Sequence, residues 1–266
     1  MKIGVCVLPV DATTRTFEEL EDAGFDAAWT YDHLEWGGWR GRPWFGALPL
    51  LAAVAARTSR IRIGTLVSSI SLRHPLELAQ QALTIDHVSG GRFDLGIGAG
   101  SVGFDAQVHG HEPWSPGERA ARFAEYVELV DALLTNERTT YTGTYYAAID
   151  APMHAGCVQR PRVPLTVAAD KPRTMAVAAR FGDRWVANSI YGEVAEKCAR
   201  LDAACAAAGR DPASIERVLL IDEPADQLRS IDDELARAEA LGFGETVFRY
   251  PHEGDRGVLA ALGSSR

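Results

Sequence analysis

The sequence is poor in the features that mark disulfide-bonded exported proteins. Its 266 residues include four cysteines, and no two of them form a Cys-x-x-Cys pair. Cys198 and Cys205 stand seven positions apart on a predicted helix. That spacing separates them by roughly 10 Å along the helix axis, which is too far for a disulfide. We therefore expect a reduced, cytoplasmic protein without structural disulfides.

Long apolar runs are also missing. The longest, FGALPLLAAVAA at residues 45–56, contains Pro49 and has about half the length that crosses a bilayer. The apolar run at the N-terminus ends at Pro9 and Asp11 without a small-residue cleavage pattern behind it. We interpret that run as a first strand and not as a signal peptide, and we expect no membrane segment.

The chain has fewer basic than acidic residues. The chain has 27 Lys and Arg against 36 Asp and Glu, which gives a formal net charge of −9. Nucleic acids and anionic membranes both bind basic surfaces, so we expect neither as a partner. With 47% hydrophobic and 24% charged residues, the chain has the composition of a globular protein with a large core. A small molecule is the expected ligand.

Short apolar segments recur along the whole chain and are predicted strands. They are apolar throughout, as in buried parallel strands, and amphipathic segments such as residues 196–208 separate them. Eight such units in about 250 residues predict a TIM (β/α)8 barrel, and an open doubly wound sheet is the alternative. The predicted strands are residues 2–8, 27–31, 61–67, 93–98, 164–169, 184–189, 216–222 and 245–250.

Three predicted helices end in a glycine with a phenylalanine beside it, followed by a predicted strand. The glycines are Gly24, Gly182 and Gly242. Glycine at the end of a helix commonly adopts the left-handed conformation that stops the helix. We expect that conformation at all three positions.

The interval between the fourth and fifth predicted strands breaks the spacing of the others. Residues from about 101 to 163 hold a loop, a predicted helix near 117–135 and the hairpin pattern TTYTGTYYA, which turns at Thr142-Gly143. We expect this insertion to lie over the C-terminal face of the barrel. No composition shift marks a second domain, so residues 1–266 are predicted to form a single one.

Two stretches resemble known binding motifs, a dinucleotide-binding glycine pattern and a metal-binding histidine pair, but the residues around them do not fit those motifs. GIGAGSVG places Gly98, Gly100 and Gly103 in the spacing G-x-G-x-x-G after a predicted strand. A Rossmann site needs a helix directly afterwards, whereas a loop rich in Gly, Pro and His follows here. These glycines more plausibly let the backbone approach a ligand closely. His109 and His111 lie in that loop, and because the other strand ends lack paired His and carboxylate ligands, no metal site is predicted.

The stretch WTYDHLEWGGW at residues 29–39 places Asp32 and His33 at a predicted strand end among tryptophans. Imidazole can both take and give a proton near neutral pH, so the pair suits a pocket that needs a proton donor or acceptor. A buried hydrogen-bonded pair that only fixes a loop is the other interpretation. These residues alone leave both open.

Lys171 follows the fifth predicted strand and precedes Pro172 and a predicted helix. Backbone amides at a helix start, together with a lysine, can bind a phosphate or an acidic chain. A solvated surface charge is the alternative for Lys171.

Three stretches together resemble the bacterial luciferase-like family of flavin and deazaflavin barrel enzymes over nearly the whole chain. They are GFDAAWTYDHL, the block RTSRIRIGTLVSSISLRHPLELAQQALTIDHVSGGRFDLGIGAG, and SPGERAARFAEYVELVDALLTNERTTYTGTYY. The middle block is the most specific of the three. The resemblance implies a TIM barrel with an insertion over its C-terminal face, in agreement with the strand count.

Within that family, an Asp-His pair after the second strand is typical of members that use the deazaflavin coenzyme F420. The resemblance therefore implies an F420-dependent oxidoreductase that transfers a hydride between the deazaflavin and a small organic substrate. His33 would be the proton donor or acceptor, and Asp32 would anchor the loop or orient the imidazole. An FMN-dependent monooxygenase that uses reduced flavin and oxygen, and a non-catalytic flavin-binding relative, are the alternatives. A homodimer is left open.

The resemblance also assigns the cofactor and substrate residues. A non-proline cis peptide is expected at Leu66-Val67, behind the tricyclic ring. Some sugar-phosphate dehydrogenases of the family carry a glutamate just after the glycines of the fourth strand, where this chain has Ser101, so a sugar phosphate is not the expected substrate. The implied ring contacts are Val67, Ser68, Ala99, Gly100 and Ser101, the contacts to the phosphate and tail are Ala168, Ala169 and Lys171, and the substrate pocket is walled by Trp36, Trp39 and Trp44.

Overall fold

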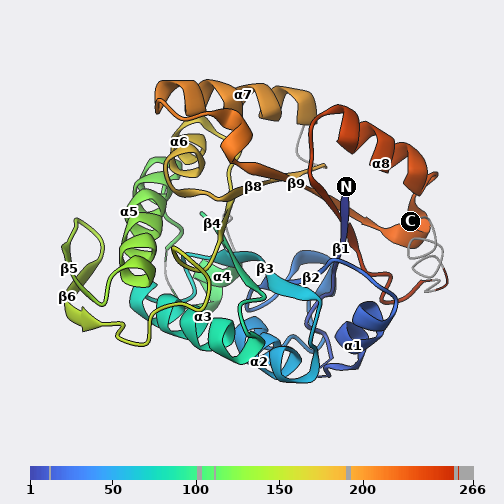
Figure 1. The fold of residues 1–266 in the computed structure, drawn as a ribbon, viewed down its shortest axis with the longest axis horizontal. Coiled ribbons are helices and arrows are strands. Elements are labelled where there is room, and N and C mark those ends of the chain that lie inside the picture. The colour runs from blue at the N-terminus through green and yellow to red at the C-terminus, as the bar shows by residue number, and fades with distance from the viewer. Residues whose placement is uncertain (12, 101–103, 111, 190–192, 255–256, 258–266) are drawn as a thin grey trace.

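Eight parallel strands close into one barrel, and helices cover its outside (Figure 1). The strands follow one another around the barrel in the order β1-β10-β9-β8-β7-β4-β3-β2. The predicted TIM barrel is confirmed, and the open doubly wound sheet is wrong. The computed structural model describes the chain except for residues 12, 101–103, 111, 190–192, 255–256 and 258–266.

The barrel strands lie within one or two residues of the predicted segments at most of their ends. They are β1 (Lys2–Cys6), β2 (Ala27–Asp32), β3 (Arg62–Ser69), β4 (Phe93–Gly98), β7 (Leu165–Ala168), β8 (Arg184–Asn188), β9 (Glu216–Pro224) and β10 (Glu245–Arg249). The α-helices are α1 (Arg15–Asp22), α2 (Ala47–Arg57), α3 (Pro75–Ser89), α4 (Phe104–Val108), α5 (Pro116–Thr135), α6 (Pro172–Phe181), α7 (Val194–Ala207) and α8 (Ile231–Ala240).

Apolar side chains pack on both sides of the strands. The larger cluster lies between the barrel and its helices, and a smaller one fills the barrel interior. Along β2, Ala27, Trp29 and Tyr31 belong to the interior cluster, whereas Ala28 belongs to the outer one. Because successive side chains of a strand point to opposite faces, burial of both faces explains why the strands are apolar throughout.

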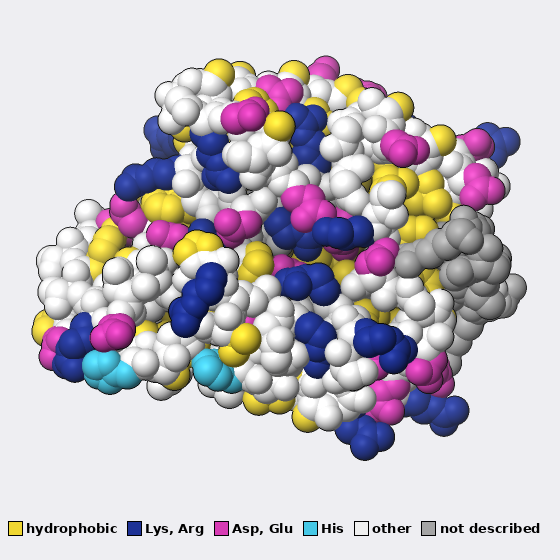
Figure 2. All heavy atoms as spheres, in the orientation of Figure 1, with side chains coloured by type: hydrophobic (Ala, Val, Ile, Leu, Met, Phe, Trp, Pro, Cys, Tyr) yellow, Lys and Arg dark blue, Asp and Glu magenta, His cyan; other side chains and the backbone are white. Residues whose placement is uncertain are grey.

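Ion pairs close the barrel at the amino ends of its strands. Arg184 of β8 donates to Glu216 of β9 at 3.0 Å and to Glu245 of β10. Burial by itself lowers the pKa of Arg184, but the charges of Glu245, Asp94 and Glu216 outweigh it and raise that pKa. Acidic and basic side chains lie side by side across the face drawn in Figure 2, without a continuous patch of one sign. The interior is therefore filled at this end, which leaves the carboxyl ends for a ligand.

In the described part of the insertion, α4 and the start of α5 lie at the C-terminal face of the barrel. The start of α5 borders the cavity there, but the rest of α5 packs between α3 and α6 as a barrel helix, because its apolar stripe from Phe123 to Leu134 has to be buried. The predicted hairpin forms from β5 (Arg138–Thr142) and β6 (Ala147–Pro152) and projects beside α5 at the periphery (Figure 1).

Two of the three helix-ending glycines have the expected conformation. Gly24 has φ +85° and Gly242 has φ +79°. The prediction is wrong for Gly182, which has φ −72° and ψ 131°. A Cβ at Gly182 would lie 2.8 Å from the carbonyl oxygen of Ala178. Glycine is suited to this position because the backbone passes too close for a side chain.

Two further expectations concern the whole chain. All four cysteines are described, and each is a buried free thiol, so the expectation of no disulfides is confirmed. Among the described helices, none combines the length and apolar character that a bilayer crossing requires.

Candidate active site

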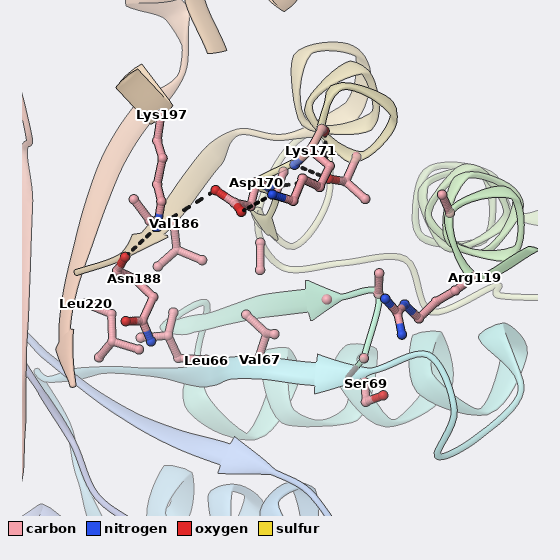
Figure 3. A pocket seen from close by; sticks show the side chains of 18 of the residues that line it. Leu66, Val67, Ser69, Arg119, Asp170, Lys171, Val186, Asn188, Lys197 and Leu220 are labelled. Atoms are coloured by element: carbon pink, nitrogen blue, oxygen red, sulfur yellow. Dashed lines mark hydrogen bonds and ion pairs between the residues drawn. The ribbon is translucent and has the colours of Figure 1, made fainter. Parts of the chain in front are cut away.

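A cavity of about 740 Å³ opens at the carboxyl ends of the barrel strands. This volume lies in the range of small-molecule sites, and the carboxyl end is where TIM-barrel enzymes place their active sites. Part of its wall is aliphatic, from side chains on β3, β7, β8 and β9 (Figure 3). These side chains are Leu66, Val67, Ala168, Val186 and Leu220.

Two regions of different polarity meet in this cavity. Tyr31, His33 and Trp36 come from the end of β2 and the loop behind it, and Asp222 comes from β9. The barrel order brings these strands together, since only β1 and β10 lie between β2 and β9. The basic side chains of the cavity come instead from α5, the β7–α6 junction and α7. They are Arg119, Lys171, Arg173 and Lys197.

His33 is held on one edge and one face. Its Nδ1 atom lies 2.8 Å from Oδ2 of Asp105 in α4, and the other oxygen of Asp105 accepts a hydrogen bond from the backbone N–H of Leu34 at 3.0 Å. The ring of Trp36 stacks on the imidazole, with centroids 4.8 Å apart and planes inclined by 30°. With Nδ1 engaged, Nε2 is the nitrogen that can exchange a proton with a ligand.

Asp105 was not foreseen from the sequence. Burial by itself raises the pKa of its carboxyl, but the hydrogen bond and charge of His33, with the N–H of Leu34, outweigh burial and lower that pKa. The carboxylate is therefore the favoured form beside the imidazole. The available signal was an acidic residue shortly after Gly100, in an insertion expected near the strand ends. No spacing rule connects it to His33.

Asp32 does not contact His33 through any hydrogen bond between described residues. Its buried carboxylate accepts from Ser68 Oγ at 2.7 Å and forms a short ion pair with Arg73. Of the two roles considered for Asp32, these contacts fit anchoring of the loop, and the orienting contact to the imidazole comes from Asp105.

The β3 segment behind the cavity is irregular. The Leu66-Val67 peptide is cis, as predicted. The pairing register with β4 shifts between Gly64 and Ser68. Ser68 was expected at the ring, but its side chain is fully buried against Asp32 and does not line the cavity, whereas Ser69 does.

The three tryptophans have different surroundings. Trp36 lines the cavity. Trp44 donates its Nε1–H to the carbonyl oxygen of His33 at 2.8 Å. The guanidinium carbon of Arg42 lies 4.7 Å from the ring centroid of Trp39, and the ring of His252 packs against the same tryptophan. Trp39 and Trp44 therefore hold the loop, and of the three predicted wall residues only Trp36 borders the cavity.

Most of the predicted cofactor residues border the cavity. Val67, Ala99, Gly100, Ala168, Ala169 and Lys171 all line it, while Ser101 lies outside the described residues. A Cβ at Gly98 would lie 2.5 Å from Val67 Cγ2, and Gly100 has φ +75°. Glycine is therefore needed where these strand ends approach each other.

The basic side chains at the mouth stand on separate elements. Figure 3 shows Arg119 reaching from α5 on one side and Lys197, Asp170 and Lys171 on the other. The side chain of Lys171 is 78% exposed, so it can meet a ligand that extends out of the cavity. Arg173, in the first turn of α6, reaches α5, since a Cβ at Gly117 would lie 3.5 Å from its Nη1. Arg119 and Lys197 were missed because the sequence does not show where their helices lie against the barrel, and Arg173 was not singled out although it is two residues from Lys171.

Two of the helices that carry these cations, α5 and α6, begin at proline. Pro116 and Pro172 occupy the first turns of α5 and α6, and Ser115 caps α5 by accepting from the N–H of Glu118 at 3.2 Å. Proline suits this place because its fixed φ matches the helix and its missing N–H would have no partner there. Residues of both helix starts line the cavity, among them Gly117 of α5 and Thr174 of α6. Within the described residues, no group of three or more His, Cys, Asp or Glu could hold a metal ion.

A closed barrel with a partly apolar cavity at its carboxyl ends and a hydrogen-bonded histidine–carboxylate pair beside it defines the general class, a TIM barrel with a cavity of ligand size. The family model described as luciferase-like monooxygenase matches residues 5–222. The chain belongs to this family, which confirms the resemblance seen in the sequence.

Curated relatives cover much of the chain. An F420-dependent glucose-6-phosphate dehydrogenase of Beutenbergia cavernae is 42% identical over 178 residues, 65% of this chain and 51% of that protein. A protein of the same description from Kineococcus radiotolerans is 35% identical over 230 residues, 80% of this chain and 65% of that protein. The chain spans about half the length of the first of these relatives.

Solved structures agree on the fold. An F420-dependent secondary alcohol dehydrogenase in complex with an F420-acetone adduct superposes with a TM-score of 0.84 at 17% identity, covering 98% of this chain and 97% of that one. The monooxygenase RslO1 from Streptomyces bottropensis superposes with a TM-score of 0.69 at 26% identity, covering 91% of this chain and 77% of that one.

Proposed function

We propose that the protein is an F420-dependent oxidoreductase that transfers a hydride between the deazaflavin and a small organic substrate. The observation that carries this proposal is His33, held by Asp105 and Trp36 at the edge of a cavity backed by the Leu66-Val67 segment. The names of the curated relatives in Beutenbergia cavernae and Kineococcus radiotolerans support the same cofactor.

The residues of the cavity fit such a coenzyme. Its flat tricyclic ring needs a narrow apolar slot, which Val67, Ala99, Ala168 and Val186 can line. Its phosphate suits the amides at the start of α6. Its acidic tail distinguishes it from FMN, and the exposed Lys171 and the cations beside it support a ligand with negative charge beyond the phosphate.

The chemistry assigned to the chain itself is proton transfer and exclusion of water. When bound, the deazaflavin accepts or gives a hydride at a carbon of its central ring. In the oxidation of an alcohol, the substrate carbon loses that hydride while His33 Nε2 takes the hydroxyl proton, so that a carbonyl forms; reduction reverses both transfers. Asp105 stabilises the imidazolium that results. Trp36 covers one face of the imidazole and keeps water from it.

A binding titration tests the proposal. Purified protein is titrated with F420 and separately with FMN, and quenching of tryptophan fluorescence and of the ligand's own fluorescence is followed. We expect clearly tighter binding of F420. Preference for FMN would instead support a monooxygenase of the same family, and binding without any turnover would support a non-catalytic relative.

A further inference from the structure

The end of the cavity beside His33 contains a carboxylate with one unused oxygen. Asp222 of β9 lines the cavity two residues after Leu220, on the same side of the strand. Its Oδ1 accepts a hydrogen bond from the hydroxyl of Tyr31 at 2.5 Å and faces Arg249 Nη1 at 3.7 Å. Among the described residues, none donates a hydrogen bond to its Oδ2.

Tyr31 contacts both the carboxylate of Asp222 and the proposed acid-base residue His33. The rings of Tyr31 and His33 meet edge to face with centroids 6.3 Å apart, and Tyr31 and Trp36 are in similar contact at 5.3 Å. Burial, followed by the charges of Cys6 and Asp222, raises the pKa of Tyr31. Tyr31 is therefore a permanent donor to Asp222. Tyr31 thus contacts both His33 and Asp222, and all three residues line the cavity.

Positive charge is absent from this end of the cavity among the described lining residues. Leu220, the neighbour of Asp222 on β9, lies across the cavity from Arg119 (Figure 3). Arg249 lies against Asp222 but does not line the cavity. A phosphate placed here would face the Asp222 carboxylate, whose charge already compensates that of Arg249, and such a like-charge contact disfavours binding. A hydroxyl group would donate a hydrogen bond to the same oxygen.

We propose that Asp222, oriented by Tyr31, is the substrate-recognition residue of this cavity, and that the substrate is an uncharged compound bearing hydroxyl groups rather than a phosphate ester. This inference rests on the proposed function, because it takes the β2–β9 end as the substrate end and the basic end as the cofactor end. It separates this chain from the substrate printed in the names of its curated relatives, glucose 6-phosphate.

Matched pairs of compounds test the proposal on the enzyme loaded with F420. The pairs are glucose with glucose 6-phosphate and glycerol with glycerol 3-phosphate, and 2-propanol is added as a single hydroxyl compound. Binding is measured by tryptophan fluorescence, and turnover by loss of the absorbance of oxidised deazaflavin. We expect at least about tenfold preference for the uncharged member of a pair.

Asp222→Asn gives the sharper result. The amide keeps the shape of the side chain but removes its charge and leaves the charge of Arg249 uncompensated, so the variant should bind the phosphate esters at least about tenfold more tightly while losing affinity for the uncharged compounds. Tyr31→Phe removes the orienting hydroxyl. This variant should bind the uncharged compounds more weakly, and its affinity for the phosphate esters should not increase. Asp22→Asn, at the exposed end of α1, is the control with the same change of charge.

Three outcomes would overturn the inference. They are equal or better use of a phosphate ester by the unmodified protein, an unchanged preference in Asp222→Asn, and failure of every uncharged compound to bind. Each presupposes that F420 binds, which is checked first in the same samples. Failure of that first step contradicts the proposed function itself, so the two failures are distinguishable.

Discussion

His33 and Asp105 meet at 2.8 Å although 72 positions separate them in the chain. One residue follows β2, and the other lies in the short helix α4 of the insertion. The contact fixes the imidazole by its Nδ1 edge and places a carboxylate beside the ring. It makes the insertion a part of the site and not only a cover over it.

Replacing Asp105 by Asn should slow turnover and change its pH dependence. The amide carries no charge, so the imidazolium that forms when His33 takes a proton loses its partner. For alcohol oxidation we expect a fall in kcat of about 10- to 100-fold, and the acid limb of kcat/KM that follows protonation of the Asp105 carboxyl, whose pKa lies below its ordinary value, should disappear. Steady-state rates across a pH series provide the measurement.

Asp105→Glu is the rescue variant for the same contact. A longer side chain that still carries a carboxylate should restore the acid limb of the profile even if the rate recovers only in part. A profile that does not move in Asp105→Asn, with an equal loss of rate at every pH, would contradict the positioning role and leave Asp105 as a structural residue of the loop.

The basic residues at the start of α6 should select the acidic tail of the coenzyme. Lys171→Ala with Arg173→Ala is expected to weaken F420 binding by about 10- to 100-fold, because a charge-assisted contact is worth roughly 1.5–3 kcal/mol. FMN, which lacks the tail, should lose less. Titrations at low and high salt provide the measurement, and the difference between variant and unmodified protein should shrink at high salt.

Arg180→Ala is the matched control for this pair of substitutions. Arg180 lies on the same helix but pairs with Glu128 outside the cavity, 2.8 Å away. It should leave F420 affinity unchanged. Equal losses for F420 and FMN in the double variant would show that these residues contact only the phosphate.

Gly98→Ala tests the wall behind the ring. The new Cβ would lie 2.5 Å from Val67 Cγ2, so Val67 would have to move into the cavity. Since the clash is with a side chain, we expect a folded protein whose stability falls by about 1–3 kcal/mol and whose F420 affinity falls about tenfold. Urea unfolding and the F420 titration measure the two effects.

Gly96→Ala provides the comparison two residues earlier. Its Cβ would lie 1.9 Å from the carbonyl oxygen of Thr65, which is backbone and cannot step aside. This variant should be far less stable than Gly98→Ala. Unaltered F420 binding in a folded Gly98→Ala protein would argue that the coenzyme does not approach Val67.

Glu21 stabilises the start of β3 from the end of α1. Its carboxylate accepts from the backbone N–H groups of Ser59, Arg60 and Ile61 at 2.9, 2.6 and 2.8 Å. Burial by itself raises the pKa of Glu21, but these hydrogen bonds outweigh it and lower the pKa to about 2. Because the folded-state pKa is depressed, this contribution is complete above the ordinary pKa of glutamate and is lost as pH falls toward about 2.

Glu21→Gln should therefore cost about 1–2 kcal/mol of unfolding free energy near pH 7 and much less at the acidic end of that window. Urea unfolding at several pH values measures the difference. Glu19→Gln is the control, since Glu19 is in an exposed ion pair with Arg15 and should change stability by less than about 0.5 kcal/mol. A cost for Glu21→Gln that is the same at every pH would contradict the assignment.

The fold was largely predictable from the sequence because the barrel strands are buried on both faces. A strand such as Phe93–Gly98 has few polar residues, and helices of ordinary length separate it from its neighbours. The conformation of Gly182 could not be predicted in the same way. Its need for glycine comes from the carbonyl of Ala178 and not from a left-handed backbone, which depends on how α6 meets β8.

The candidate site was predictable where its residues sit at strand ends. His33, Val67, Ala99, Ala168 and Ala169 follow directly from the strand pattern and the family resemblance. The family resemblance also assigned Ser68 to the cavity, but the side chain of Ser68 lies against Asp32 where the register of β3 is irregular. Site residues that lie on helices, or on strands far away in the sequence, could not be recognised from the sequence around them.

Asp105 and Asp222 illustrate that limit. Asp105 meets His33 through a short helix in the insertion, and Asp222 meets Tyr31 from the other side of the barrel closure, 191 positions away. Neither contact follows from spacing or hydrophobic periodicity, because each depends on three-dimensional closure of the barrel and its loops.

Hydride transfer in the His33→Asn variant tests the central claim most directly. The substitution keeps a hydrogen-bonding side chain of similar size but cannot exchange a proton near neutral pH. Protein loaded with F420 is mixed with the compound that the unmodified enzyme oxidises fastest, and a single turnover is followed by loss of deazaflavin absorbance, beside thermal melting and F420 affinity. We predict near-normal melting and affinity with a rate about 10²- to 10⁴-fold lower. A folded variant that binds F420 and transfers hydride at the unmodified rate would contradict the account.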